Sequence, residues 1–443
     1  MAFHLLGLDA SALMSDYMLK EFAASQGLKL TPSATRDKGL PHRMTDGDKI
    51  LQIINVAKLC DMPIREYLIK EKIHDYPTRM VKQIAQNYES FKALSNVYDY
   101  TDMLWMAKTA ELDLPELEYL FIDEAQDLSA LQWTLVNRLA ERANNIVIAG
   151  DDKQAINSFA GADIDTFLTL PGRVETLEQS YRVPMAAFDM ANNIVVKMTK
   201  YRKEGSYWRC RRDMGQVQRI TSIPIQKIRN GEDWLILARS GYQLQPLAQE
   251  LFRLDENRKG IIFNINGNPP VDLQLYLLAQ AWKDNREYLL DWVSPVLETD
   301  TAEVKECKQK YRALFSHFIK KQGKTVTQKR LETEARTPWY HVGNVDAMQR
   351  LYIEATLPEY RKKGNRLFID AKVRLMTIHA AKGREATNVL LYLNLPKSVI
   401  ETIRYGDPDT ELKVLYVALT RTKKRLFLFS DKPQPYSYAD LFT

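Results

Sequence analysis

The chain has 443 residues, 45% of them hydrophobic and 27% charged, and this composition excludes a disordered protein. Its length predicts about two to four domains, and its net charge of +6 permits a polyanionic partner without requiring one. Three widely spaced cysteines exclude a disulfide framework and a zinc motif. We see no signal peptide and no apolar run long enough to cross a bilayer, so we expect a protein of the reducing cytoplasm with no membrane contact.

Hydrophobic periodicity predicts helices and strands in a clear order along the chain. Residues 12–100 are expected to be mostly helical, and residues 117–149 show a strand, helix, strand pattern. The predicted elements there are Leu117–Ile122, Leu131–Ala143 and Ile146–Ala149. A buried strand at 234–238 and a helix at 243–252 follow, and turn residues at 264–270 mark a boundary. Residues 271–366 are expected to be helical. Strands return at 373–376, 388–393 and 425–429, with an amphipathic helix around 412–419.

Two adjacent carboxylates, Asp123 and Glu124, follow the apolar run Tyr119–Ile122. We expect a buried parallel strand that delivers both acids to the carboxyl edge of an open α/β sheet, where ligands bind. In nucleotide hydrolysis, one such acid can hold Mg²⁺ and the other can polarise the attacking water. Gly150, Asp151 and Asp152 end the next predicted strand and place further carboxylates at the same edge. The sequence nevertheless has no G-x-x-x-x-G-K-[ST] phosphate loop.

Five segments at predicted strand or helix ends form an ordered series. They are Phe121–Asp127 (FIDEAQD), Gly150–Ile156 (GDDKQAI), Leu177–Arg182 (LEQSYR), Met376–Glu385 (MTIHAAKGRE) and Val414–Arg421 (VLYVALTR). The series resembles motifs II to VI of the UvrD/Rep-like superfamily 1 DNA helicases, and the resemblance covers about residues 99–430. Asp99–Leu104 (DYTDML) resembles the family's D-F-x-D-L-L segment.

The resemblance implies an α/β fold with two RecA-like parallel-sheet domains and two helical insertions, the first sheet domain being incomplete at its N-terminus. The implied division has six parts. They are 1–11 (remnant of the first RecA-like domain), 12–100 (helical insertion), 101–180 (first RecA-like domain), 181–270 (second RecA-like domain, first part), 271–367 (reduced helical insertion) and 368–443 (second RecA-like domain, second part).

The implied ligands are ATP and Mg²⁺. By resemblance, Asp123 coordinates Mg²⁺, Glu124 activates the attacking water, and Gln154 senses the γ-phosphate. Tyr181 stacks on adenine and Glu385 binds the ribose.

Two arginines complete the implied nucleotide site. Arg182 reaches the γ-phosphate, and Arg421 acts as an arginine finger from the second sheet domain. Planar guanidinium groups stabilise the charge that spreads over a transferring phosphoryl group.

The implied DNA-binding residues are Phe159, Thr377 and His379. Phe159 replaces the family's usual tryptophan, so base stacking and a core position both stay open. A half-buried structural role stays open for His379. Asn157 and Ala160 depart from the family's tyrosine and arginine, which puts the contacts of this segment in doubt.

Two basic stretches have no motif support. Lys200–Arg212 mixes basic and aromatic residues, so a strand-binding groove and a solvated loop are equally compatible with it. Lys305–Arg330 is expected to form the polar face of helices.

The implied function is ATP-dependent translocation on single-stranded DNA with duplex unwinding, in the 3′ to 5′ direction. Three hypotheses address the absent phosphate loop: a helicase split over two polypeptides, a truncated product, or a non-catalytic DNA-binding or regulatory subunit. We favour a split or recently truncated helicase because the acids and arginines are retained. The expected partners are single-stranded or junction DNA and a polypeptide that carries the phosphate loop, and the chain is otherwise expected to be a monomer.

Overall fold

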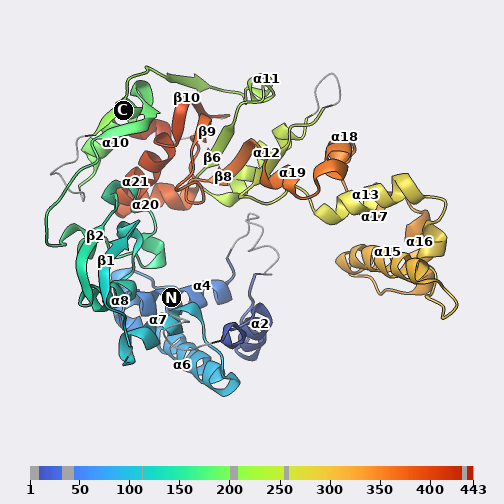
Figure 1. Cartoon of the computed structure of the whole chain (residues 1–443), viewed down its shortest axis with the longest axis horizontal. Coiled ribbons are helices and arrows are strands. Elements are labelled where there is room, and N and C mark those ends of the chain that lie inside the picture. Colours follow the sequence, from blue (N-terminus) through green and yellow to red (C-terminus); the bar gives the residue numbers. More distant parts are fainter. Residues whose placement is uncertain are drawn as a thin grey trace.

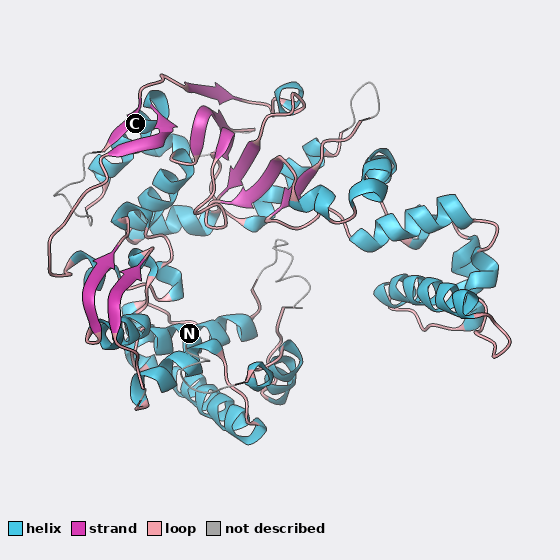
Figure 2. Ribbon diagram, in the orientation of Figure 1, coloured by secondary structure: helices cyan, strands magenta, loops and turns pink. Residues whose placement is uncertain are grey.

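The computed structural model describes residues 9–31, 44–111, 113–199, 208–253, 259–431 and 437–442. These residues form two lobes and a helical arm (Figure 1). The first lobe holds helices α2 to α9 and strands β1 and β2, the second is built on a six-stranded sheet, and the arm projects from the second lobe. Parallel strands and many helices (Figure 2) confirm the expected α/β class.

The elements have the following bounds. The helices of the first lobe are α2 (Asp16–Ser25), α4 (Asp46–Leu59), α5 (Ile64–Lys70), α6 (Thr78–Ser95), α7 (Tyr100–Thr109), α8 (Ala130–Ala140) and α9 (Ile164–Leu168). Those of the second lobe are α10 (Met185–Lys197), α11 (Ile225–Ile228), α12 (Leu244–Leu251), α19 (Arg366–Ile369), α20 (Lys397–Tyr405) and α21 (Pro408–Leu419). The arm contains α13 (Leu273–Asn285), α14 (Leu289–Trp292), α15 (Ala302–Lys321), α16 (Gln328–Arg336), α17 (Trp339–Val342) and α18 (Ala347–Lys363). The strands are β1 (Leu117–Ile122), β2 (Ala143–Ile148), β3 (Gln179–Pro184), β4 (Arg209–Arg211), β5 (Gln216–Ile220), β6 (Trp234–Ala238), β7 (Phe263–Ile265), β8 (Val373–Thr377), β9 (Ala386–Tyr392) and β10 (Thr422–Phe429).

The large sheet is parallel throughout, in the order β5-β10-β9-β6-β8-β7. Its strand β6 is buried along its whole length and has the bounds that the sequence predicted. Side chains alternate between the two faces of a strand, so Trp234 and Ile236 enter one core while Leu235 and Leu237 enter the other. Helices α10 and α21 cover the second of these faces.

The arm lies between β7 and β8 in the sequence and consists of the helices expected at 271–366. Its apolar core, which includes Phe315, Phe318 and Trp339, is continuous with one face of the large sheet. The basic stretch Lys305–Arg330 mostly falls on α15 and α16, although Lys308 is buried and pairs with Asp300. No helix in the described ranges is both long and apolar enough to cross a membrane.

Strands β1 and β2 form a separate parallel sheet of two strands. We expected β1 to be buried, but Tyr119 is 53% exposed and Phe121 is 70% exposed. Both lie on the face opposite to α8, which covers Leu120 with Leu139. The expectation was wrong because burial of a strand needs cover on both faces, and the described residues cover only one.

Two predicted boundaries also differ from the structure. The helix predicted to reach Ala143 ends at Ala140, and β2 begins at Ala143 because it pairs there with Leu117. Asn264, predicted as a turn residue, lies inside β7 and donates from Nδ2 to the carbonyl of Phe368 (2.9 Å). Pairing with a neighbouring strand overrides weak strand propensity at both positions.

The segment Asp99–Leu104 begins α7 and contains a buried ionic cluster. Asp99 is the N-cap and Asp102 the third helical residue of a capping box. Lys92 Nζ, from α6, lies 2.9 Å from Asp99 Oδ2 and 2.6 Å from Asp102 Oδ2, and Lys58 also contacts Asp102. The cluster therefore ties α4, α6 and α7 of the first lobe together.

Candidate active site

The turn after β1 carries Asp123 and Glu124 at the carboxyl edge of the small sheet. Both side chains are exposed, and Asp123 Oδ1 accepts a hydrogen bond from the backbone N–H of Glu124 (2.8 Å). Glu124 has φ 50° and ψ 38°, a left-handed conformation that costs a non-glycine residue about 1–2 kcal/mol. This turn redirects the chain so that the two neighbouring carboxylates stay at the strand's end.

Gln126 connects the ends of β1 and β2. Its side chain is fully buried, donates from Nε2 to Glu124 Oε2 (2.5 Å) and accepts at Oε1 from the backbone N–H of Asp151 (2.9 Å). A Cβ at Gly150 would lie 2.6 Å from Gln126 Oε1, so a larger residue at this strand exit would displace the Gln126 amide. Local sequence pattern does not single out Gln126, although Gly150, at the end of the next strand, is a signal of close packing there.

Replacing Gln126 by leucine is expected to lower the free energy of unfolding by about 1–3 kcal/mol, because the N–H of Asp151 would be buried without an acceptor. Chemical denaturation measures this loss. The exposed Gln83, on α6, provides a matched Gln→Leu control that should stay within about 0.5 kcal/mol of the unmodified chain. Equal losses in the two variants would contradict the assignment of Gln126 as a positioning residue.

Gln154 and Arg421 meet across the two lobes. Arg421 Nη2 donates to Gln154 Oε1 (2.7 Å), and Gln154 Nε2 donates to Asp151 Oδ2 (2.7 Å). Arg421 is 1% exposed, and its Nε donates to the carbonyl of Val417 (3.0 Å). Burial lowers the pKa of Arg421 to about 10, and the neighbouring charge of Arg182 contributes a smaller part of this shift. A continuous chain of hydrogen bonds therefore runs from the second-lobe arginine to the strand-end carboxylates.

Arg182 lies on β3 close to the same place. Its Nη1 is 3.7 Å from Glu385 Oε2, and its Nε is buried without a hydrogen-bond partner among the described residues. A hydrogen bond from Lys423 (2.5 Å) lowers the pKa of Glu385 despite partial burial, and the charges of Arg182 and Arg421 act in the same direction. Two neighbouring guanidinium groups, one with an orphan N–H, are suited to an anion.

Tyr181, adjacent to Arg182 on β3, is 83% exposed. The site thus combines an exposed aromatic ring, the partly exposed Arg182, the buried Arg421 and two exposed strand-end acids, and these residue types could hold a nucleoside triphosphate. The described residues contain no cluster of three or more His, Cys, Asp or Glu side chains that could hold a metal. Mg²⁺ needs no such cage, since it commonly binds through one or two carboxylates together with phosphates and water.

Lys382 makes a second connection between the lobes, which the sequence analysis missed. Its Nζ contacts Asp127, donates to the carbonyl of Gln154 (2.9 Å) and lies 3.6 Å from Glu124 Oε2. The side chain is 11% exposed, so solvent screens these charges weakly. Its position within the Met376–Glu385 segment was the one feature of the sequence that could have marked Lys382 as a site residue.

The three residues expected to bind DNA occupy different environments. Thr377 ends β8, and its Oγ1 accepts from the N–H of Ala380 (3.3 Å). His379 is half-buried and shares a hydrogen bond with the backbone of Ile156 in the first lobe. Phe159 belongs to the short helix η4 (Ser158–Ala160), and its side chain lies outside the described part of the structure. Their roles toward DNA stay predictions.

Burial of His379, with the nearby charges of Arg239 and Lys382, lowers its pKa from 6.5 to about 4 against the opposing effect of the Ile156 hydrogen bond. Between these two values the unfolded chain binds a proton that the folded chain does not, so stability falls as the pH drops from 6.5 to 4. The full loss is about 3 kcal/mol. We expect His379→Asn to flatten this part of the profile in denaturant unfolding measured at several pH values.

The control for that experiment is His74→Asn, because His74 is exposed. It should keep the pH dependence of the unmodified chain. A His379→Asn profile as steep as that of the control would contradict the prediction.

The basic and aromatic stretch Lys200–Arg212 is only partly visible, since residues 200–207 lie outside the described ranges. In the remainder, Trp208 packs edge-on against Phe188, with ring centroids 4.6 Å apart. Arg209 pairs with Glu178 and Arg211 with Asp213. These described residues therefore already have protein partners.

The first part of the chain is similar to known helicases. The profile of the UvrD/REP helicase N-terminal domain matches residues 9–175. This region belongs to the UvrD/Rep-like helicase family. Among UvrD/Rep-like relatives, the ATP-dependent DNA helicase PcrA of Staphylococcus epidermidis (strain RP62A) is 27% identical over 152 residues, which cover 31% of this chain and 21% of the relative. PcrA of Staphylococcus aureus (strain Mu50) is 29% identical over 147 residues, covering 30% and 20%.

The matched part of the chain thus spans about a fifth of the length of these curated UvrD/Rep-like relatives. Asp123, Glu124, Gln154 and Phe159 fall within the region that the family profile matches. The other expected site residues come after it, at positions 181, 182, 377, 379, 385 and 421.

Proposed function

We propose that this chain forms the nucleotide-hydrolysing and DNA-translocating part of a UvrD/Rep-type helicase, with 3′ to 5′ movement on single-stranded DNA. The observation that carries this proposal is the hydrogen-bonded connection between the lobes, from Arg421 through Gln154 and Asp151 to Gln126 and Glu124. Such a connection allows closure of the lobes to control the geometry of the strand-end acids.

The nucleotide supplies the phosphoryl group, and Mg²⁺ supplies charge neutralisation at the phosphates. Asp123 would hold the metal, and Glu124, positioned by Gln126, would accept the proton of the attacking water. Gln154 would report on the terminal phosphate, since its amide already lies between Asp151 and Arg421.

The second lobe supplies the remaining groups of the proposed site. Arg182 and Arg421 would stabilise developing negative charge, and the orphan Nε of Arg182 supports this assignment. The exposed Tyr181 ring would stack on adenine. The carboxylate of Glu385 would accept a hydrogen bond from a ribose hydroxyl.

Movement along DNA would follow from opening and closing of the lobes. Lys382 and Arg421 both cross to the first lobe at the nucleotide site, so their contacts would change with each closure. Thr377 and His379, in the same segment as Lys382, and Phe159 would contact the strand. His379 already touches the first lobe at Ile156, which supports coupling between strand contacts and closure.

We further propose that a polypeptide segment carrying a phosphate loop completes the site. None of the 443 residues forms the G-x-x-x-x-G-K-[ST] motif. The uncovered face of the small sheet, with Tyr119, Phe121 and Val147 exposed, supports this proposal. A parallel sheet is normally covered on both faces, so this apolar face is suited to contact further structure.

Steady-state ATP hydrolysis with Mg²⁺, with and without single-stranded DNA, tests the proposal. It is measured on the purified chain and on any complex that copurifies with it. Glu124→Gln should lower DNA-stimulated turnover by about 10²–10⁴-fold, since a positioned general base is lost. The matched control is Glu118→Gln, an exposed change on β1 away from its carboxyl end, which should leave turnover unchanged.

Absence of turnover in both preparations, together with tight DNA binding that nucleotide does not alter, would contradict hydrolysis. It would support a DNA-binding or regulatory subunit instead. A change of DNA affinity on adding nucleotide would support the helicase proposal by reciprocal linkage.

A further inference from the structure

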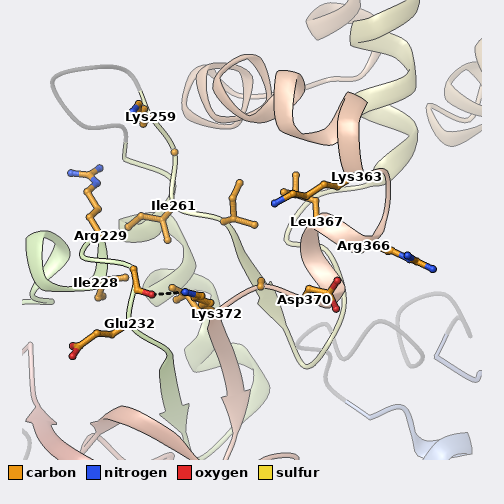
Figure 3. A pocket seen from close by; sticks show the side chains of 15 residues that line it. Ile228, Arg229, Glu232, Lys259, Ile261, Lys363, Arg366, Leu367, Asp370 and Lys372 are labelled. Carbon is orange, nitrogen blue, oxygen red and sulfur yellow. Dashed lines mark hydrogen bonds between the residues drawn. The ribbon is translucent and has the colours of Figure 1, made fainter.

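A hollow of about 490 Å³ lies at the amino ends of β6, β7 and β8, where the arm joins the second lobe (Figure 3). Its lining comes from three segments: residues 228–232 before β6, 259–262 before β7, and 363–373 from the end of α18 to the start of β8. The third of these segments joins the end of the arm to β8, whereas the second connects α12 to β7. We call this hollow the arm-root pocket.

The lining of the arm-root pocket is predominantly basic. Five cationic residues, Arg229, Lys259, Lys363, Arg366 and Lys372, line it together with only two acids. Of the acids, Glu232 lies 2.7 Å from Arg425 Nη1 and also accepts from Asn388, neither of which lines the pocket. Its charge is therefore already compensated, and Asp370 is the one remaining acid of the lining.

Neutral acceptors hold two of the cations in place. Lys372 Nζ donates to the carbonyl of Gly231 (2.9 Å), and Arg229 Nη2 donates to the carbonyl of Arg253 (2.8 Å). The Nε of Arg229 is buried and has no hydrogen-bond partner among the described residues. Carbonyl groups orient these side chains without cancelling their charge, so both remain able to attract an anion.

The direction of the Lys363 side chain and the apolar floor of the pocket both favour binding of an anion. Figure 3 shows the amine of Lys363 directed toward the hollow, whereas Arg366 points away from it. The apolar floor consists of Ile228, Ile261, Leu367 and Val373, all of them buried. A low-polarity floor weakens dielectric screening, which strengthens attraction of an anion to the basic rim.

We propose that the arm-root pocket binds backbone phosphates of the DNA strand on which the protein acts. Arg229 and Lys372, which are oriented by carbonyl groups, suit phosphate oxygens, which accept charge-assisted hydrogen bonds. Arg229 and Lys372 belong to the body of the second lobe, whereas Lys363 ends the arm helix α18. A strand bound here contacts both parts, so DNA binding restrains the orientation of the arm. This inference rests on the proposed function for its choice of DNA.

Salt dependence of DNA binding provides the first test. We compare the unmodified chain with the double variant Lys259→Glu and Lys363→Glu, by fluorescence anisotropy of a labelled DNA strand with a duplex junction. Each lost phosphate contact lowers the magnitude of the slope of log affinity against log salt concentration by about 0.7–0.9. The slope of the double variant should therefore be smaller in magnitude by about 1 to 2. The charge-matched control is Lys283→Glu with Lys329→Glu, two exposed arm residues that do not line the pocket, and its slope should fall less.

Lysine acetylation read by mass spectrometry provides the second test, on the unmodified chain. DNA should protect Lys259 and Lys363 from acetylation, whereas Mg-ATP alone should not. Protection by ATP instead of DNA would assign the pocket to a mononucleotide and overturn the proposal. DNA binding without protection, or equal slopes in the two double variants, would overturn it as well. Absence of any DNA binding would instead contradict the proposed function.

Discussion

Replacing Arg421 by lysine is expected to lower ATP turnover by about 10³-fold or more in the hydrolysing complex, the effect typical of a lost arginine finger. The guanidinium donates at once to Gln154 Oε1, to the carbonyl of Val417 and to Thr420 Oγ1. A lysine keeps the charge but presents a single ammonium group that cannot make this planar set of bonds. Steady-state kinetics should show the loss in kcat, while DNA affinity without nucleotide stays within about twofold of the unmodified value.

A neighbouring residue gives the matched control. Arg384 is exposed, and only its backbone carbonyl faces Arg421. Arg384→Lys should therefore keep most of the turnover. Because Arg421 is buried, the unfolding transition of each variant must also be measured. A turnover loss that only follows a loss of folded protein would show that Arg421 is structural.

Replacing Lys92 by methionine is expected to lower the free energy of unfolding by about 3 kcal/mol, because Asp99 would lose its counter-charge and Asp102 would keep only Lys58. Lys92 is 3% exposed and contacts both Asp99 and Asp102. Burial by itself would raise the pKa of Asp102, but hydrogen bonds from Lys58 and Lys92 hold it below its ordinary value. Methionine fills a similar volume without a charge, so the change tests the ionic contacts more than the packing.

Urea unfolding followed by tryptophan fluorescence measures this loss, since Trp105 lies on α7 beside the cluster. The control is Lys49→Met, which removes a partly exposed lysine 3.8 Å from Asp46 on the same lobe. Exposed pairs contribute about 1 kcal/mol or less, so the control should unfold almost as the unmodified chain does. Similar losses in the two variants would contradict the assigned role of Lys92.

Local sequence pattern was sufficient to predict the type and position of many helices and strands. The strands β1 and β6 have the predicted bounds because each is a short apolar run ended by polar or turn residues. The predicted helix at 243–252 differs from α12 by one residue at each end. Errors arose at Ala143 and Asn264, where pairing with a distant strand decided the conformation against local propensity.

The placement of the strand-end acids also followed from the sequence, since carboxyl ends of parallel strands meet at one edge. The contacts that organise the site did not follow from it. Gln154 and Arg421 are 267 positions apart, and Lys382 lies 255 positions from Asp127. No local periodicity encodes such pairs, because they depend on how the two lobes pack.

The sequence by itself therefore determined the α/β class, most of the strands and helices, and the order of the motif segments, since these depend on periodicity and on residue type at strand ends. Tertiary structure alone decided which side chains are buried. Tyr119 and Phe121 have the composition of core residues, yet the face that carries them is exposed. Arg421 has the charge of a surface residue, yet it is buried, and His379 is half-buried. Burial is a property of what packs against a residue, and that information lies in contacts between distant parts of the chain.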